Sequence, residues 1–226
     1  GEDTLSLHDA FRSINDGNEY QIDSKQHSNL ENLLFFAKDE MIKPCISHFV
    51  SWIHQHEHFD KTNFATNLKR QLGKIYKSNR PNFLYAYSIE HKYTTQAEID
   101  GNFDYGIYDY SDSDTLLEYL HIHIYVIMDC HKIDPANMPI AVVSALDKLD
   151  GLTKSHYLPS YDGMKYKELN DNSIDDIFNR IIYIAKLNQK SSDIPFRQTF
   201  GMSKLISSKQ QVANHCYFNS QKALYR

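Results

Sequence analysis

The chain has 226 residues, of which 41% are hydrophobic, and a formal net charge of −5. This length and composition are sufficient for a globular domain with a sizeable core and exclude a disordered chain. No run approaches the ~18 apolar residues of a membrane-spanning helix, and no signal peptide is recognisable. The three cysteines are widely spaced and form no paired motif. We therefore expect a cytoplasmic protein without disulfides and without a membrane partner.

The charges are unevenly distributed along the chain. From Lys148 to Arg226 there are 12 Lys and Arg against 7 Asp and Glu, whereas the preceding part has 12 against 22. A basic last third beside an acidic remainder indicates a polyanionic partner that contacts the C-terminal part. Ordinary variation between solvated faces would give the same pattern, so the charges alone leave both interpretations open.

The first part of the chain predicts an arm followed by helices. Residues 1–27 are polar and irregular, which favours a flexible arm. Over residues 28–57, Ser28 and Glu31 have the spacing of a capping box, and apolar residues recur at helical intervals. Pro44 interrupts this pattern and predicts a break or kink. We therefore expect an N-terminal helical segment here.

The rest of the chain mixes helices with a few strands. The expected elements are a helix over 60–76, a strand over 83–93, a hairpin excursion or long loop over 96–120, a strand over 119–129, a helix over 140–149, a loop over 152–172 and a helix over 173–190. Strands separated by long excursions favour antiparallel pairing. The predicted fold class is α+β, with an antiparallel central sheet and flanking helices.

Two histidines lie inside the most strand-like run of the chain, residues 119–128. Because side chains alternate along a strand, His121 and His123 point to one face, about 7 Å apart. Ile122 and its apolar neighbours fill the opposite face, which we expect to be the core face. Two adjacent imidazoles suit a divalent metal that takes a third ligand, although two solvated histidines would give the same pattern.

The preceding strand, residues 83–93, offers a carboxylate as third ligand. Alternation places Glu90 on the same face as the small residues Ala86 and Ser88. Pairing this strand with the histidine strand would bring the carboxylate beside both imidazoles. Two histidines and a carboxylate, with open positions for water and substrate oxygen, suit Mn²⁺ or Mg²⁺ acting on a phosphate.

The helix predicted over 173–190 offers a nucleophile. Tyr183 and Lys186 are one turn apart, so their head groups can reach the same point. A tyrosine attacks a phosphodiester well when a cation or metal stabilises its phenolate, and Lys186 could supply that charge. With 16 tyrosines in the chain, a tyrosine on a helix is more commonly a packing residue. The lysine and the metal motif favour the catalytic interpretation here.

A strand with the pattern H-hydrophobic-H, followed by a helix with Y-x-x-K, resembles the HUH endonucleases, a class that includes rolling-circle replication initiators, relaxases and related transposases. The segments YIAKLNQK (183–190) and RQTFGMSK (197–204) are similar to the inovirus-type initiators. In that group a strand ending in glutamate precedes the H-x-H strand, as YSIE does here. The resemblance covers about residues 83–204.

The resemblance implies the following roles for individual residues. His121, His123 and Glu90 would be metal ligands for Mn²⁺ or Mg²⁺, Tyr183 the nucleophile and Lys186 its partner. The stretch between Glu90 and His121 is longer and more acidic than the short hairpin expected for the family. An acid within this stretch could therefore replace Glu90 as third ligand, the candidates being Asp104, Asp109 and Asp114.

The resemblance also implies a function. We expect a sequence-specific single-strand DNA endonuclease and strand transferase that initiates rolling-circle replication through a 5′-phosphotyrosine. The alternatives are a relaxase or transposase of the same superfamily, or a non-catalytic nucleic-acid-binding or regulatory domain. The expected partner is single-stranded DNA or an origin hairpin, and a host helicase is left open. The catalytic core would span 79–210, with 1–78 as an arm and helical segment packed on it and 211–226 as a tail.

Basic and aromatic side chains predict where a single strand would bind. Such strands are held by cationic grooves and by aromatic rings that stack on bases. A solvated loop has a similar composition, so this prediction depends on the rest of the site. The candidates are Lys154, Tyr157 and Lys165 in the loop over 153–167, followed by Lys190, Arg197 and Lys204.

A second H-x-H triplet, His54-Gln55-His56, lies in the predicted first helix. Residues two apart on a helix do not face each other, so this triplet is not expected to bind a metal. His54 and His58 could share a helix face, but no carboxylate or cysteine nearby completes a site. A polar helix end is the favoured interpretation.

Overall fold

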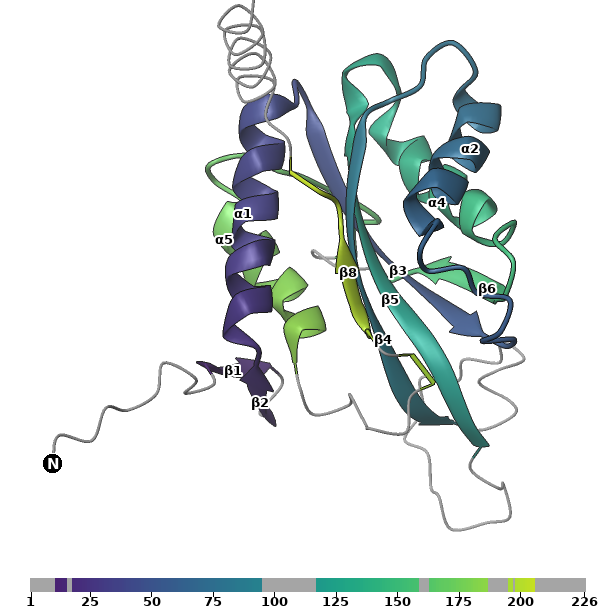
Figure 1. Ribbon diagram of the computed structural model, residues 1–226. Coiled ribbons are helices and arrows are strands. Elements are labelled where there is room, and N and C mark those ends of the chain that lie inside the picture. The colour runs from purple at the N-terminus through teal and green to yellow at the C-terminus, as the bar shows by residue number, and fades with distance from the viewer. Residues whose placement is uncertain are drawn as a thin grey trace, which may run out of the picture.

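The computed structural model describes residues 11–15, 18–94, 117–158, 163–186, 195–196 and 198–205. Its centre is an antiparallel sheet in the order β6-β3-β5-β4-β8, with β7 also paired to β3 (Figure 1). The strands of this sheet are β3 (Pro44–Ile53), β4 (Phe83–Thr94), β5 (Leu117–Asp129), β6 (Leu152–Tyr157), β7 (Lys167–Glu168) and β8 (Phe200–Met202). The predicted α+β class with an antiparallel central sheet is confirmed.

Helices flank the sheet on both sides, with α2 and α4 on one side and α1 and α5 on the other (Figure 1). Two further strands, β1 (Phe11–Asn15) and β2 (Asn18–Ile22), form a separate hairpin. Within the described residues, no helix is long and apolar enough to cross a membrane. The helices are α1 (Ser24–Glu40), α2 (Phe64–Tyr76), α4 (Met138–Leu146) and α5 (Ile174–Ile181), with the 3₁₀ turns η1 (Cys130–Lys132), η2 (Pro135–Asn137) and η3 (Ile182–Ala185).

The chain path interlocks two β-α-β units. In the first, β3 leads through α2 to β4, and β5 lies between these two strands. In the second, β5 leads through α4 to β6, and β3 lies between them. This is the split β-α-β arrangement. It makes β3, β5 and β4 adjacent central strands, so side chains from three distant segments meet on each face of the sheet.

One face of the sheet, here called the core face, is packed by α2 and α4. Ile122, Ile124 and Val126 of β5 are fully buried there. Phe64 and Leu68 of α2 are four residues apart and therefore lie on the same side of the helix, against this face. The predicted core face of the histidine strand is confirmed.

The opposite face, here called the site face, is covered by α1 and α5 rather than by solvent. Tyr125 and Ile127 of β5 belong to its buried apolar cluster, together with Leu33 of α1 and Ile177 of α5. The N-terminus of α1 is capped by Asp23, whose side chain accepts a hydrogen bond from the Gln26 backbone N–H at 2.8 Å. The sheet is therefore buried on both faces.

The helix predicted over 28–57 is wrong beyond Glu40. Residues 44–53 form β3, the strand between β5 and β6. All ten of its residues are buried because helices cover both faces of the sheet. A strand buried on both faces is apolar along nearly its whole length, and such a run lacks the alternation that distinguishes a strand from a helix. The region 1–78 thus contributes a central strand to the sheet.

Two other expectations are also corrected. The loop predicted over 152–172 contains β6 and β7, and β6 lacks clean alternation because its register with β3 shifts at a bulge. The helix predicted over 173–190 ends at Ile181 and continues as η3, after which Lys186 is extended. The strands predicted over 83–93 and 119–129 and the helix near 140–149 are confirmed, with shifted ends. Residues 95–116 and 211–226 lie outside the described residues.

Candidate metal centre

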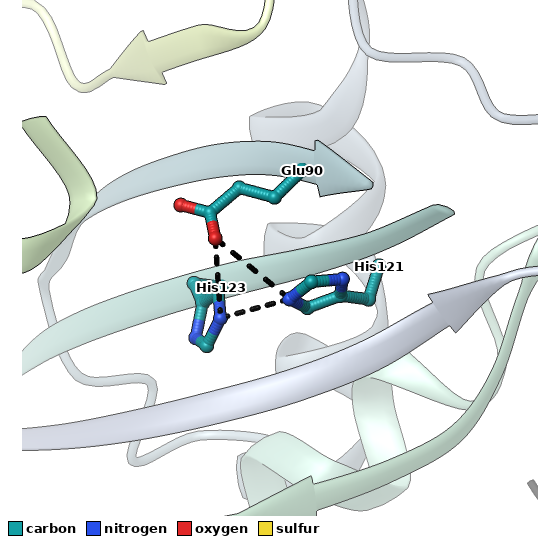
Figure 2. A group of neighbouring side chains, drawn as sticks. All are labelled: Glu90, His121 and His123. Carbon is teal, nitrogen blue, oxygen red and sulfur yellow. Dashed lines mark hydrogen bonds and ion pairs between the residues drawn. The ribbon is translucent and has the colours of Figure 1, made fainter. Parts of the chain in front are cut away.

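Three side chains of neighbouring strands converge on the site face. The strand register places Glu90 of β4 opposite His121 of β5. Oε2 of Glu90 is 3.8 Å from Nε2 of His121 and 3.7 Å from Nε2 of His123, and the two Nε2 atoms are 3.0 Å apart (Figure 2). Glu90 is fully buried and the two histidines are at most 8% exposed. The predicted approach of Glu90 to both histidines is confirmed.

This group could hold a metal ion. Its three ligand atoms lie within 4.8 Å of one another, and it is the one such group of histidine, cysteine and acidic residues in the described part of the chain. Imidazole nitrogens and a carboxylate oxygen are donors that divalent transition metals accept. Because all three point from a rigid sheet toward one spot, little rearrangement is needed to form a coordination shell.

A buried lysine lies against the same carboxylate. Nζ of Lys186 is 3.0 Å from Oε2 of Glu90, and the two side chains are 1% and 0% exposed. Lys186 reaches this position because the chain leaves η3 there and pairs its backbone with Ile22 at the end of β2. Burial lowers the pKa of Lys186, while the charge and hydrogen bond of Glu90 act to raise it. The oxygen that faces both histidines is therefore also the partner of an amine.

The candidate nucleophile adjoins both groups. Nζ of Lys186 is 3.4 Å from the ring centroid of Tyr183. The ring of Tyr183 meets that of His123 nearly at right angles, with centroids 5.4 Å apart. The expected neighbourhood of Tyr183 and Lys186 is thus present, although the backbone between them is 3₁₀ rather than α-helical. The structure brings both beside the Glu90-His121-His123 group.

A third histidine, His48 of β3, was missed by the sequence analysis. Its Nε2 is 3.0 Å from Nδ1 of His123, and its ring is stacked on Tyr125 with centroids 4.1 Å apart and planes 10° apart. Burial lowers the pKa of His48 to about 3, and the nearby charges of His156 and Lys186 act in the same direction. The imidazole of His48 is therefore neutral at physiological pH.

The signal for His48 exists in the sequence, but it depends on assigning β3 as a strand. In a strand, His48, Val50 and Trp52 share one face, and the register pairs Val50 with His123 and Trp52 with His121. The Trp52 ring lies 6.0 Å from the His121 ring, centroid to centroid. Trp52 is the one tryptophan of the chain and is 3% exposed. Its buried ring therefore lies beside the Glu90-His121-His123 group.

The predicted nucleic-acid contacts of the 153–167 segment separate in space. Lys154 is exposed at the β6 bulge, where its φ of 49° is unusual for a residue other than glycine. Tyr157 pairs with Phe49 and packs against the core-face cluster, away from the metal group. Lys165 is exposed, with Nζ 5.0 Å from the Tyr157 ring centroid. Of the neighbouring residues, His156 lies opposite Val50, on the site face.

One of the remaining predicted contacts, Lys204, lies away from the metal group. Lys204 is exposed just after Ser203, whose backbone N–H donates to the carbonyl of Tyr85. From there Glu90 lies about 17 Å further along β4. Two predicted contacts and the three alternative acidic ligands lie outside the described residues, namely Lys190 and Arg197, and Asp104, Asp109 and Asp114.

The second H-x-H triplet is not helical. His54, Gln55 and His56 follow the end of β3 in an exposed turn, where a ring nitrogen of His58 is hydrogen-bonded to the side-chain oxygen of Gln55 at 2.9 Å. The expected helix is wrong here. Among the described residues, these histidines belong to no group that could hold a metal.

In comparisons with known proteins, no protein family, curated protein or solved structure matches this chain.

Proposed function

We propose that this protein is a metal-dependent single-strand DNA endonuclease and strand transferase that uses Tyr183 as its nucleophile. The observation that carries the proposal is the convergence on Oε2 of Glu90. Two imidazole nitrogens and the amine of Lys186 surround this oxygen, and Tyr183 lies directly beside them. Metal ligands, a cation and a nucleophile next to one another are the components of tyrosine-based phosphodiester chemistry.

The chemistry follows from these groups. A divalent ion held by Glu90, His121 and His123 would act as a Lewis acid toward the scissile phosphate, and Mn²⁺ and Mg²⁺ are the proposed ions. The phenol oxygen of Tyr183 attacks phosphorus, a P–O bond to Tyr183 forms, and the bond to the 3′ oxygen breaks. The phenol loses its proton and the leaving 3′ oxygen gains one. A 3′-hydroxyl that attacks the 5′-phosphotyrosine reverses these changes and joins the strands.

Lys186 has a defined part in this reaction. Its amine lies between the carboxylate of Glu90 and the ring of Tyr183, at 3.0 Å and 3.4 Å. A cation at this position favours the phenolate form of Tyr183 and offsets negative charge that builds up on the phosphate. Lys186 is therefore the charge-balancing partner of the nucleophile.

The proposed substrate is single-stranded DNA or an origin hairpin of a small replicating element. The exposed lysines Lys154 and Lys165, on and after β6, would contact phosphates, in keeping with the net positive charge of residues 148–226. Initiation of rolling-circle replication rests on the resemblance of residues 183–190 and 197–204 to inovirus-type initiators.

A covalent adduct tests the proposal. The protein is incubated with a broad pool of labelled single-stranded oligonucleotides and Mn²⁺, and the products are separated on a denaturing gel. Wild type is expected to yield a protein–DNA adduct that is absent with EDTA and in Tyr183→Phe. Tyr166 packs against the core-face cluster, so Tyr166→Phe should keep the adduct. An adduct that persists in Tyr183→Phe would assign the nucleophile to another residue.

One observation favours the non-catalytic alternative. Lys186 already neutralises Glu90 at 3.0 Å, so the site is electrostatically balanced without a metal. A nucleic-acid-binding or regulatory domain on the same scaffold would retain that ion pair. It predicts that the oligonucleotide pool is bound, with or without EDTA, and that no strand is cleaved.

A further inference from the structure

We propose that His48 is a positioning residue of the metal centre: its imidazole accepts the hydrogen bond of His123 Nδ1–H and so directs Nε2 of His123 at the metal. This inference rests on the metal-binding part of the proposed function and is independent of DNA cleavage. It concerns a side chain of β3, a strand that supplies none of the three proposed ligands.

The tautomer of His123 carries the argument. A neutral histidine that binds a metal through Nε2 has its proton on Nδ1, and that proton needs an acceptor when it is buried. Nδ1 of His123 is 3.0 Å from Nε2 of His48, and both side chains are less than 9% exposed. Nε2 of His123 faces the other way, 3.7 Å from the Glu90 carboxylate. His48 thus contacts the nitrogen that is not available to the metal.

The surroundings of His48 hold its ring in place beside His123. His48 is 6% exposed and lies flat against the Tyr125 ring, with centroids 4.1 Å apart and planes 10° apart. The strand register places His48 opposite Tyr125, two residues along β5 from His123. Backbone pairing and stacking therefore fix the position of the imidazole.

The same contacts link the metal ligand to the element that carries the nucleophile. The Tyr125 hydroxyl donates to the carbonyl of Arg180 in α5 at 3.0 Å. Because α5 leads directly into η3, this bond connects the stacked pair of Tyr125 and His48 to the segment that holds Tyr183. His48 is therefore held by stacking on Tyr125 and by its contact with His123, and Tyr125 is in turn hydrogen-bonded to α5.

Two variants separate the hydrogen bond from the packing. His48→Phe keeps a ring on Tyr125 but removes the acceptor, and His48→Gln keeps an acceptor without the ring. Binding of Co²⁺ as the probe metal is measured by its visible absorption and by quenching of Trp52, which lies 6.0 Å from His121. His48→Phe is expected to bind Co²⁺ about 10–100-fold more weakly than wild type, and His48→Gln within several-fold of it.

A double-mutant cycle distinguishes positioning from a general loss of structure. In a His123→Ala background, His48→Phe should weaken Co²⁺ binding no further, because the hydrogen bond no longer exists. Melting in EDTA checks that each variant folds, and His48→Leu replaces His48→Phe if the latter does not fold. If His48→Phe, which has no hydrogen-bond acceptor, binds Co²⁺ with the same affinity as wild type, the proposal is overturned. An equal loss of affinity with and without His123 also overturns it.

The outcomes also separate this inference from the proposed nuclease. Wild type that binds Co²⁺ but forms no adduct with DNA refutes the nuclease, while the His48 measurements still decide the positioning role. Wild type that binds no Co²⁺ overturns the His48 inference together with the proposed metal site.

Discussion

The two faces of the central sheet are built on the same strands but are stabilised in different ways. On the core face, Ile122 and Ile124 are fully buried against α2 and α4. On the site face, the interleaved His121 and His123 are nearly as buried, yet they are polar. Burial of apolar groups is favourable by itself, whereas buried polar groups are tolerated only when they have partners. The stability of the site face therefore depends on specific polar pairs, whereas the stability of the core face depends on how completely apolar side chains fill the space.

This difference predicts how each face responds to a metal. The partners on the site face are Glu90, Lys186, His48 and the two histidines themselves. A metal that binds there adds a partner to the folded state alone and should stabilise it. The core face lies on the other side of the sheet, so its side chains make no contact with the metal and are not directly stabilised by it. Substitutions on the two faces should therefore differ in whether metal reverses their cost.

The largest effect is expected for Lys186→Met. The substitution leaves the carboxylate of Glu90 buried without its cation, which should lower the free energy of unfolding by about 4 kcal/mol in EDTA. It also removes the amine with which a metal competes for Oε2 of Glu90. Saturating Mn²⁺ should therefore restore much of the loss, and urea unfolding with EDTA or with Mn²⁺ measures both quantities.

A double variant serves as the control for this result. Glu90→Gln combined with Lys186→Met removes both charges, so it should be more stable in EDTA than Lys186→Met alone and should gain nothing from Mn²⁺. If Mn²⁺ stabilised Lys186→Met no more than this double variant, Glu90 would not be a ligand.

A smaller effect, of a different kind, is expected on the core face. Ile124→Ala removes a fully buried side chain between α2, α4 and the sheet, and should cost about 3 kcal/mol. Because the cavity lies on the far side of the sheet, Mn²⁺ should raise the melting temperature of this variant by the same amount as that of wild type. Differential scanning fluorimetry with and without Mn²⁺ measures this, and a lost Mn²⁺ response would contradict the independence of the two faces.

The strands could be predicted where their two faces differ in polarity. In β5, histidine and tyrosine alternate with isoleucine and valine, so the side-chain parity of Glu90, His121 and His123 follows from the sequence. In β3 both faces are buried, and the sequence pattern of its residues wrongly predicts a helix. The strand order places β3 next to β5 through contacts distant in sequence, which local patterns do not contain.

The site, like the strands, could be predicted where it depends on local spacing and not where it depends on tertiary contacts. Tyr183 and Lys186 are three residues apart, a spacing that keeps two side chains on one side in both an α-helix and a 3₁₀ turn, so the wrong helix type did not separate them. His48 could not be found because its role depends on the register of β3 against β5. The ion pair of Lys186 with Glu90 requires the tertiary placement of η3 and was likewise not foreseen.

The smallest effect is expected at the end of β5 that is remote from the metal group. Asp129 lies about 26 Å along the strand from His121. Its carboxylate accepts hydrogen bonds from the backbone N–H groups of Lys43 at 3.0 Å and Ile42 at 3.3 Å, and it contacts His131 at 3.0 Å. Burial acts to raise the pKa of Asp129, but these hydrogen bonds outweigh it, and the pKa is lowered.

The lowered pKa fixes the sign of the pH dependence. Because the folded state holds the Asp129 proton less tightly than the unfolded chain, where the pKa is about 3.9, the stabilisation is complete well above pH 4. It is lost as the pH falls from there through the pKa of the folded state. Asp129→Asn should therefore cost about 1 kcal/mol at pH 7, less at pH 3, and should leave the Mn²⁺ response unchanged at every pH. Urea unfolding across this range measures the slope. If the stability of Asp129→Asn changed with pH as much as that of wild type, Asp129 would not be the source of the pH dependence. A changed Mn²⁺ response in this variant would mean that the two ends of β5 are coupled.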